Sequence, residues 1–306
     1  MSFIQPHAAR PRAKLTARKM IISARYMNVA RHSNKWSLLR RLTSSSGNPE
    51  LEMMYANQAA VRKQRNAEAD TVHATKHKSD DTLTYGASHM RGLRPTMEDA
   101  DSCALSLHQS PRHALFGVFD GHGGSGAARF AADAIAVELG TKLAANDGDD
   151  VTDPEQVSLL HTFAELDQTI LANSDIHQSG ACALVALLSR ADADIDGSGG
   201  AGAGAGRPTT IHVANCGDSR AVLGRKAGLP ALALSRDHKP NDDVERARVE
   251  AAGGEVVSVT YEQPGEERPV SVDRINGRLA VARALGNVRY KVSTGETEAV
   301  HSDSYV

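Results

Sequence analysis

The chain has few cysteines and few aromatic residues. Its 306 residues include three cysteines, and aromatic side chains make up 4% of them. Cys103, Cys182 and Cys216 form no CxxC pair and no even set, so the sequence indicates neither a secreted disulfide scaffold nor a structural zinc site. We therefore expect a reducing, intracellular compartment, either cytoplasmic or nuclear.

Long apolar runs are also missing. The longest uncharged one, ACALVALLS at 181–189, is far shorter than the roughly 20 residues that a membrane-spanning helix needs, so no membrane span is predicted. Few aromatic residues lie among the basic ones, and no nucleic-acid partner is expected. With 41% hydrophobic residues, the chain is long enough to bury one large core or two smaller ones.

Acidic residues are absent before Glu50. Residues 1–80 hold 15 Lys and Arg against 5 Asp and Glu, a balance of +10, which leaves 20 against 32, or −12, for residues 81–306. Because residues 1–80 also lack an apolar period, we predict a disordered basic arm or a presequence. An Arg-rich, acid-poor start suits mitochondrial import as the alternative, although Arg18 and Ile22 would share one helix face, which is poor amphipathic separation.

Residues 81–306 are predicted to form one domain. The segments 83–92 and 113–119 have strand patterns, and an alanine-rich helical stretch follows Gly126. A second helix is predicted after Asp153 and Pro154. Its core-facing residues follow helical spacing: Val157, Leu160, Phe163, Leu166 and Ile170.

Two further strand patterns, 183–189 and 209–223, flank a segment rich in glycine and alanine. This segment, 191–207, offers no side chains to bury, so we predict a flexible hairpin loop. A last helix is predicted over 241–252, with Asn241 as its N-cap and two glycines as its stop signal.

Acidic residues lie at or near strand ends in three places. The apolar strand in HALFGVFDGHGGSG ends in Asp120 and His122, followed by glycines that let the backbone approach a ligand closely. Glu98 and Asp99 form a second acidic pair, and Asp218 occupies a tight turn between two strands. Carboxylates, and a carbonyl beside one, are the ligands that Mg²⁺ and Mn²⁺ prefer. Each place alone is weak evidence, because such residues are usually solvated or merely form turns.

Together and in this order, the segments resemble the metal-dependent protein serine/threonine phosphatases of the protein phosphatase 2C, or PPM, family. Five motifs within 83–291 carry the resemblance: GLRPTMEDA, FGVFDGHGG, VANCGDSRAVL, SRDHKPNDDVERARVEAAGGEV and RINGRLAVARALGNVRYK. The resemblance implies an α+β fold, an antiparallel β-sandwich flanked by helices in α-β-β-α layers. It also implies hydrolysis of phosphoserine and phosphothreonine monoesters by water that two Mg²⁺ or Mn²⁺ ions activate.

The resemblance implies roles for the acidic residues. Asp120 would bridge the two ions, and Glu98 and the Gly121 carbonyl would complete the protein ligands of one of them. Asp99 would hold water at the ions. Asp218 would serve a further, weaker ion, or it is a carboxylate that stabilises its turn.

Two other residues take roles from the same resemblance. Arg94 would bind the phosphate, because its planar, permanently charged guanidinium matches two phosphate oxygens. His122 would be the general acid for the leaving oxygen, or it is a loop residue that caps the next helix. An ester hydrolase that uses Ser125 is disfavoured, since a GxSxG elbow would need glycine where Ala127 stands.

The sequence departs from the family at its end. Family members continue beyond the ARALG motif and supply two more aspartates, whereas the closing stretch here has Glu296, Glu298 and Asp303 outside any strand-turn context. We therefore expect a domain without its last part, in which one ion keeps its ligands and the other loses two carboxylates. Asn287 stands where the family usually has aspartate, and Cys182 where it usually has threonine.

Two functional hypotheses follow. The first is an active, monomeric phosphatase whose partners are phosphoprotein substrates. The second is a catalytically impaired pseudophosphatase that binds phosphoproteins or another partner through the site of Arg94.

Overall fold

A computed structural model describes residues 19–23, 74–80, 83–92, 94–146, 152–190, 209–225, 229–261 and 269–291. Its helices are α3 (Gly126–Ala145), α4 (Pro154–Ala172), α5 (Asp243–Ala251) and the 3₁₀ turn η1 (Val288–Tyr290). Its strands are β1 (Lys19–Ser23), β2 (Ala74–Ser79), β3 (Thr84–His89), β4 (Ala100–Ala104), β5 (His113–His122), β6 (Gly180–Arg190), β7 (Thr209–Cys216), β8 (Arg220–Gly224), β9 (Leu232–Ala233), β10 (Val256–Tyr261), β11 (Val270–Ile275) and β12 (Leu285–Gly286).

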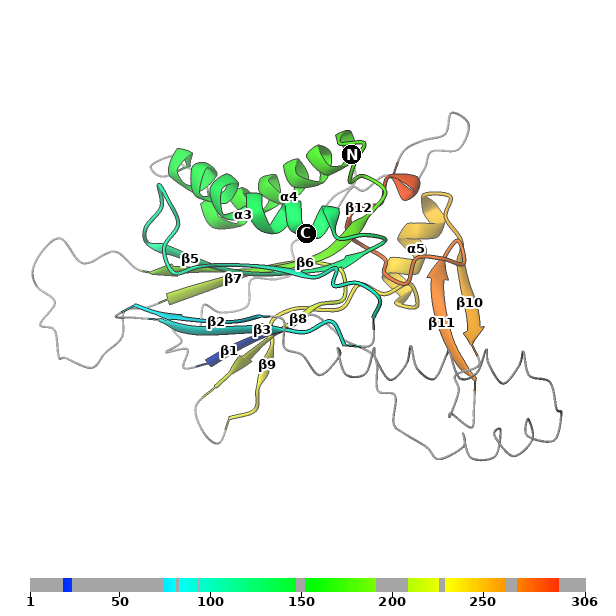
Figure 1. Cartoon of the computed structure of the whole chain (residues 1–306), viewed down its shortest axis with the longest axis horizontal. Helices are drawn as coiled ribbons and strands as arrows, with labels where there is room; N and C mark the ends of the chain where they lie inside the picture. The colour runs from blue at the N-terminus through cyan, green and yellow to red at the C-terminus, as the bar shows by residue number, and fades with distance from the viewer. Residues whose placement is uncertain are drawn as a thin grey trace, which may run out of the picture.

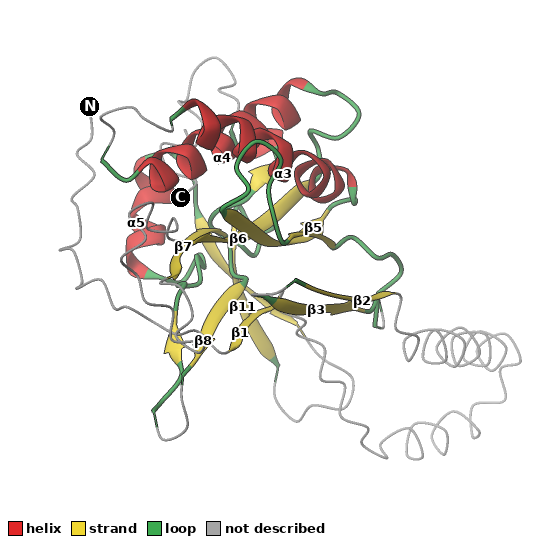
Figure 2. Ribbon diagram, turned by 90° about the vertical axis from the view of Figure 1, so that its left-hand side faces the viewer, coloured by secondary structure: helices red, strands yellow, loops and turns green. Residues whose placement is uncertain are grey.

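A five-stranded antiparallel sheet forms the centre of the fold. Strand β6 pairs with β5 along one edge and with β7 and β12 along the other, and β4 pairs with the outer edge of β5. Helices α3 and α4 cover one face of this sheet, and the strands β2–β3 and β1–β8–β9 lie on its opposite side (Figure 1). Figure 2 shows the same layers after a quarter turn. Antiparallel sheets with packed helices make this an α+β fold, as the sequence predicts.

The main core lies between the sheet and the two long helices. Leu115 and Phe119 of β5 are fully buried there, because alternate residues of a strand point to the same face. Helix α3 meets the sheet through small side chains, Ala127, Ala128 and Ala131, which permit a close approach. Asp120 lies between two positions that face the helices, so its own side chain belongs to the opposite face of β5.

Helix α4 differs in detail from its prediction. It begins after Asp153 as expected, and the Asp153 carboxylate accepts a hydrogen bond from the Gln156 amide. Val157 and Leu160 are only half-buried, however, whereas Leu159 and the polar residue Asp167 are buried. The apolar period therefore located the helix but placed part of its buried face one or two positions away.

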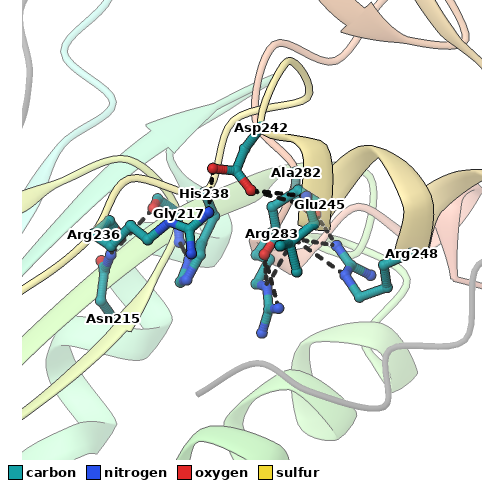
Figure 3. Close-up of polar contacts among 10 residues, drawn as sticks. Asn215, Gly217, Arg236, His238, Asp242, Glu245, Arg248, Ala282 and Arg283 are labelled. Atoms are coloured by element: carbon teal, nitrogen blue, oxygen red, sulfur yellow. Dashed lines mark hydrogen bonds and ion pairs between the residues drawn. The ribbon is translucent and has the colours of Figure 1, made fainter. Parts of the chain in front are cut away.

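Helix α5 has a different N-cap from the predicted Asn241. The Asp242 carboxylate accepts hydrogen bonds from the amides of Val244 and Glu245, which satisfies the first turn. The buried carboxylate of Glu245 also accepts from Arg248 and Arg283 (Figure 3). This network ties α5 to the chain that leads into β12.

Paired strands also occur before residue 81. Strand β2 pairs with β3, and β1 pairs in register with β8 from Lys19 opposite Gly224 to Ser23 opposite Arg220. The remaining residues before 74 lie outside the described part of the chain. So do the predicted loop 191–207 and the closing stretch that contains Glu296, Glu298 and Asp303. Within the described helices, none is long and apolar enough to cross a membrane.

Candidate active site

Five of the seven predicted site residues line one pocket. Arg94, Glu98, Asp99, Asp120 and Gly121 surround a volume of ≈ 190 Å³ with two neighbours, Pro95 and Thr96. The pocket lies where the segment between β3 and β4 meets the C-terminal end of β5. Segments about 20 residues apart in sequence thus bring three carboxylates and a guanidinium to one place.

Glycine at position 121 is required for this close approach. A Cβ atom there would lie 2.1 Å from the Glu98 carbonyl oxygen and 2.9 Å from its carbon, distances that no side chain tolerates. The Glu98 carboxylate is oriented in turn by Thr96, whose hydroxyl donates to Oε1 at 2.9 Å. The sequence motif therefore fixes the backbone geometry of the pocket as well as its charge.

Asp120 is in an unfavourable place for an ionised side chain. Burial is the largest cause that raises the pKa of Asp120 to about 7, followed by the charges of Asp99 and Asp218. Glu98 acts in the same direction, and the positive charge of Arg94 opposes it only in part. A bound divalent cation would compensate this crowded negative charge, so the donor set fits Mg²⁺ or Mn²⁺. Asp120, Glu98 and the Gly121 carbonyl are the groups that could hold it.

Asp218 lies beside this pocket and does not line it. Its Oδ2 accepts a hydrogen bond from Lys239 Nζ at 2.7 Å, and the Cys182 thiol lies 3.7 Å from its Oδ1. Cys182 is the register partner of Asp120 on the neighbouring strand β6. A cation at Asp218 would therefore compete with the ammonium group of Lys239.

The turn that carries Asp218 is held by the segment 236–238. The Gly217 amide donates to His238 Nδ1 at 3.2 Å, and the His238 amide donates to the Gly217 carbonyl at 2.8 Å. Asn215 Nδ2 donates to the carbonyls of Gly217 and Arg236 (Figure 3). The DHKP motif thus has a direct structural connection to the turn.

His238 gives this support a pH dependence. Burial, with the nearby charge of Arg283, lowers the pKa of His238 to about 4. Its neutral Nδ1 must accept from Gly217, so between about pH 6.5 and pH 4 the unfolded chain binds more protons than the folded one. The free energy of unfolding should therefore fall by about 1–3 kcal/mol as the pH falls through this window.

Urea unfolding at several pH values would measure this effect. The matched variant His238→Gln retains a side-chain acceptor but has no titratable group, and its loss of stability between pH 6.5 and pH 4 should be smaller than that of the wild type. Equal losses for the two proteins would show that His238 is not responsible.

His122 does not line the pocket either. Its Nε2 donates to Asn287 Oδ1 at 2.7 Å, and burial lowers the pKa of its imidazole, with Glu98 and Asp218 acting in the opposite direction. Helix α3 begins after Ser125, which is its N-cap residue, and the amide of Ala127 in its first turn donates to Ser179 Oγ. The alternative role of His122 as the cap of the next helix is therefore wrong.

A second group of potential metal ligands lies at the other end of β5. The ligand atoms of Asp153, Glu155 and His212 are within 4.8 Å of one another. Asp153 already caps α4, and Glu155 Oε1 accepts from His113 Nε2 and Ser189 Oγ, which helps lower the pKa of Glu155 to about 2. These contacts explain the group as part of the connection between α4 and the sheet.

Sequence reasoning missed two partners of the predicted residues. Lys239 belongs to a motif for which the sequence predicts no site residue, yet it pairs with Asp218. Asn287 was noted only as a departure from the family, yet it contacts His122. Each contact joins distant segments, so only the charge of the lysine and the departure at 287 could have indicated them.

Several known proteins are similar to this chain. A family model described as "Protein phosphatase 2C" matches residues 83–306. "Protein phosphatase 2C homolog 2" of Schizosaccharomyces pombe is 35% identical over 225 residues, covering 71% of this chain and 50% of that protein. "Probable protein phosphatase 1N" of Homo sapiens is 36% identical over 216 residues, covering 70% and 42%. A crystal structure of a phosphatase from Toxoplasma gondii has 24% identity and a TM-score of 0.46, with coverage of 67% and 66%.

An antiparallel α+β fold with carboxylates clustered beside an arginine is compatible with a protein that binds divalent cations and phosphate. The match over 83–306 then identifies the family: the chain belongs to the protein phosphatase 2C family. It spans about half the length of the curated relatives named above.

Proposed function

We propose that this chain is a metal-dependent protein phosphatase that hydrolyses phosphoserine and phosphothreonine monoesters. The observation that carries the proposal is the position of Asp120, half-buried among three other carboxylates and in the field of Arg94. The carboxylates of this site could bind divalent cations, and Arg94 could bind a phosphate group next to them. Membership of the family supports the same activity.

The residues of the chain have separate tasks in this reaction. Glu98, Asp120 and the Gly121 carbonyl would hold Mg²⁺ or Mn²⁺, which when bound would supply Lewis acidity and lower the pKa of water. Asp99 accepts a hydrogen bond from the attacking water and so orients it. Arg94, which is exposed at the rim of the pocket, binds the non-bridging oxygens of the phosphate.

Water forms the new bond to phosphorus and releases one proton to solvent, and the bond from phosphorus to the serine or threonine oxygen breaks. The leaving oxygen takes one proton, which His122 supplies, and His122 is later protonated again by solvent. The products are an alcohol and inorganic phosphate. No covalent intermediate with the protein is needed.

A phosphothreonine peptide tests the proposal directly. The full chain with millimolar Mn²⁺ should release inorganic phosphate, and EDTA should stop the release until Mn²⁺ is added in excess. Binding of the peptide without turnover, lost in Arg94→Ala, would favour the pseudophosphatase instead. Release that EDTA does not affect would contradict metal dependence.

A further inference from the structure

We propose that Asn287 is a positioning residue, which holds the imidazole of His122 in the orientation needed to protonate the leaving oxygen. The inference rests on the proposed phosphatase function, because it assigns a task within that reaction. Asn287 contacts His122 but is not among the residues that line the pocket.

The hydrogen bond between the two residues is short and shielded. His122 Nε2 donates to Asn287 Oδ1 at 2.7 Å, and Asn287 is only 7% exposed. An amide oxygen can only accept, so this contact keeps a proton on Nε2, and the proton for the leaving oxygen must be a second one, carried on Nδ1 by the doubly protonated ring. His122 directly follows Gly121, which lines the pocket, and Nδ1 is the ring nitrogen that does not contact Asn287.

The backbone around Asn287 is rigidly held. Its amide donates to the Ser179 carbonyl at 2.9 Å, and its own carbonyl accepts from the Tyr290 amide at 2.9 Å. Its backbone is left-handed, with φ 58° and ψ 53°, a conformation that asparagine adopts more readily than most residues. The amide oxygen therefore has little freedom to move away from the ring.

The opposite strand leaves space for the pair. Gly180 is the register partner of His122, and a Cβ atom on it would lie 2.1 Å from Asn287 Oδ1 and 2.5 Å from His122 Nε2. The glycine thus permits the two side chains to meet above β6. Residues from three separate segments, His122, Gly180 and Asn287, thus make this one hydrogen bond possible.

Leaving-group dependence distinguishes positioning from general support of the fold. A threonine alkoxide needs a proton when it leaves, whereas p-nitrophenolate leaves without one, so a fault in the general acid affects the two substrates unequally. Asn287→Gly removes the amide and tolerates the left-handed backbone. We expect it to lower kcat on a phosphothreonine peptide by about 10- to 100-fold, while kcat on p-nitrophenyl phosphate changes by less than about threefold.

Two further variants serve as controls. Asn287→Asp keeps an oxygen acceptor in the same place and should retain the ratio of the two rates. Asn276→Gly changes another left-handed asparagine, at φ 49°, whose Oδ1 accepts from the Glu255 amide far from His122. It should leave both rates unchanged. Equal loss on the two substrates in Asn287→Gly would overturn the inference.

A spectroscopic measurement keeps this result separate from the proposed activity. Nitrogen-15 correlation spectra of the metal-free protein should show His122 with its proton on Nε2, and Asn287→Gly should lose that fixed tautomer. If the wild type hydrolyses neither substrate but the spectra change as expected, the proposed function fails while the orientation of the ring by Asn287 stands. Unchanged spectra would contradict the inference whatever the activity.

Discussion

Asp120→Asn is expected to lower Mn²⁺-dependent hydrolysis of a phosphothreonine peptide by more than about 100-fold, since loss of even an indirect metal contact costs 10- to 100-fold. Asparagine has nearly the same shape as aspartate, but it removes the charge that the cations require. Calorimetry should show that Mn²⁺ binding weakens in parallel. The exposed variant Asp133→Asn, on the outer face of α3, should retain both properties.

The same substitution should stabilise the metal-free protein. An acid whose pKa is raised to about 7 in the folded state and lies near 4 in the unfolded state costs stability as the pH rises between these values. Asp120→Asn removes this cost, which amounts to up to about 4 kcal/mol at pH 8. Its melting temperature in EDTA should therefore exceed that of the wild type by at least about 2 °C at pH 8, with a smaller difference at pH 5.

Opposite signs for activity and stability are the distinctive result. A residue that merely packs or caps would lose stability and activity together. Added Mn²⁺ should raise the melting temperature of the wild type but not of the variant, because only the wild type binds the ion in its folded state. Full Mn²⁺ stabilisation of Asp120→Asn would refute the assignment of this carboxylate.

The local sequence predicted the elements of this fold well, because their signals lie within single segments. The apolar run before Asp120 is β5, the Gly-rich turn after it leads into α3, and the pattern after Pro154 is α4. The three carboxylates of the pocket were also predictable, since a short acidic pair and a strand end both belong to recognisable motifs.

Contacts between distant segments could not be predicted in the same way. Asp167 falls among the apolar positions of α4, and nothing near it in sequence explains a buried charge. Its partner Lys291 follows 124 positions later. Likewise, the Asn241 prediction failed because three capping residues stand in a row, and only the backbone geometry selects Asp242. Contacts that depend on tertiary packing therefore cannot be predicted from the local pattern of a single sequence.

Asp167→Ala is expected to cost about 3–5 kcal/mol of folding free energy. Asp167 Oδ1 accepts from Lys291 Nζ at 2.6 Å and from the Gly286 amide at 2.7 Å, and the two side chains are only 3% and 8% exposed. Removing the carboxylate leaves a buried amide unpaired and a buried ammonium group without its counter-charge. Lys291 Nζ also donates to the Ala284 carbonyl at 2.7 Å.

Urea unfolding of three variants would separate these contributions. The double variant Asp167→Leu with Lys291→Met removes both charges and should recover a large part of the loss, although the Gly286 amide stays unpaired. Glu165→Ala, a change on the same helix as Asp167, breaks the exposed pair with Lys142 of α3 and should cost less than about 1 kcal/mol. We therefore expect burial of the ion pair to determine how much folding free energy is lost when the pair is broken. Equal losses for Asp167→Ala and Glu165→Ala would contradict this expectation. Because Asp167 also fixes Gly286, the residue before Asn287, its loss should disturb the hydrogen bond to His122 as well as the stability of the domain.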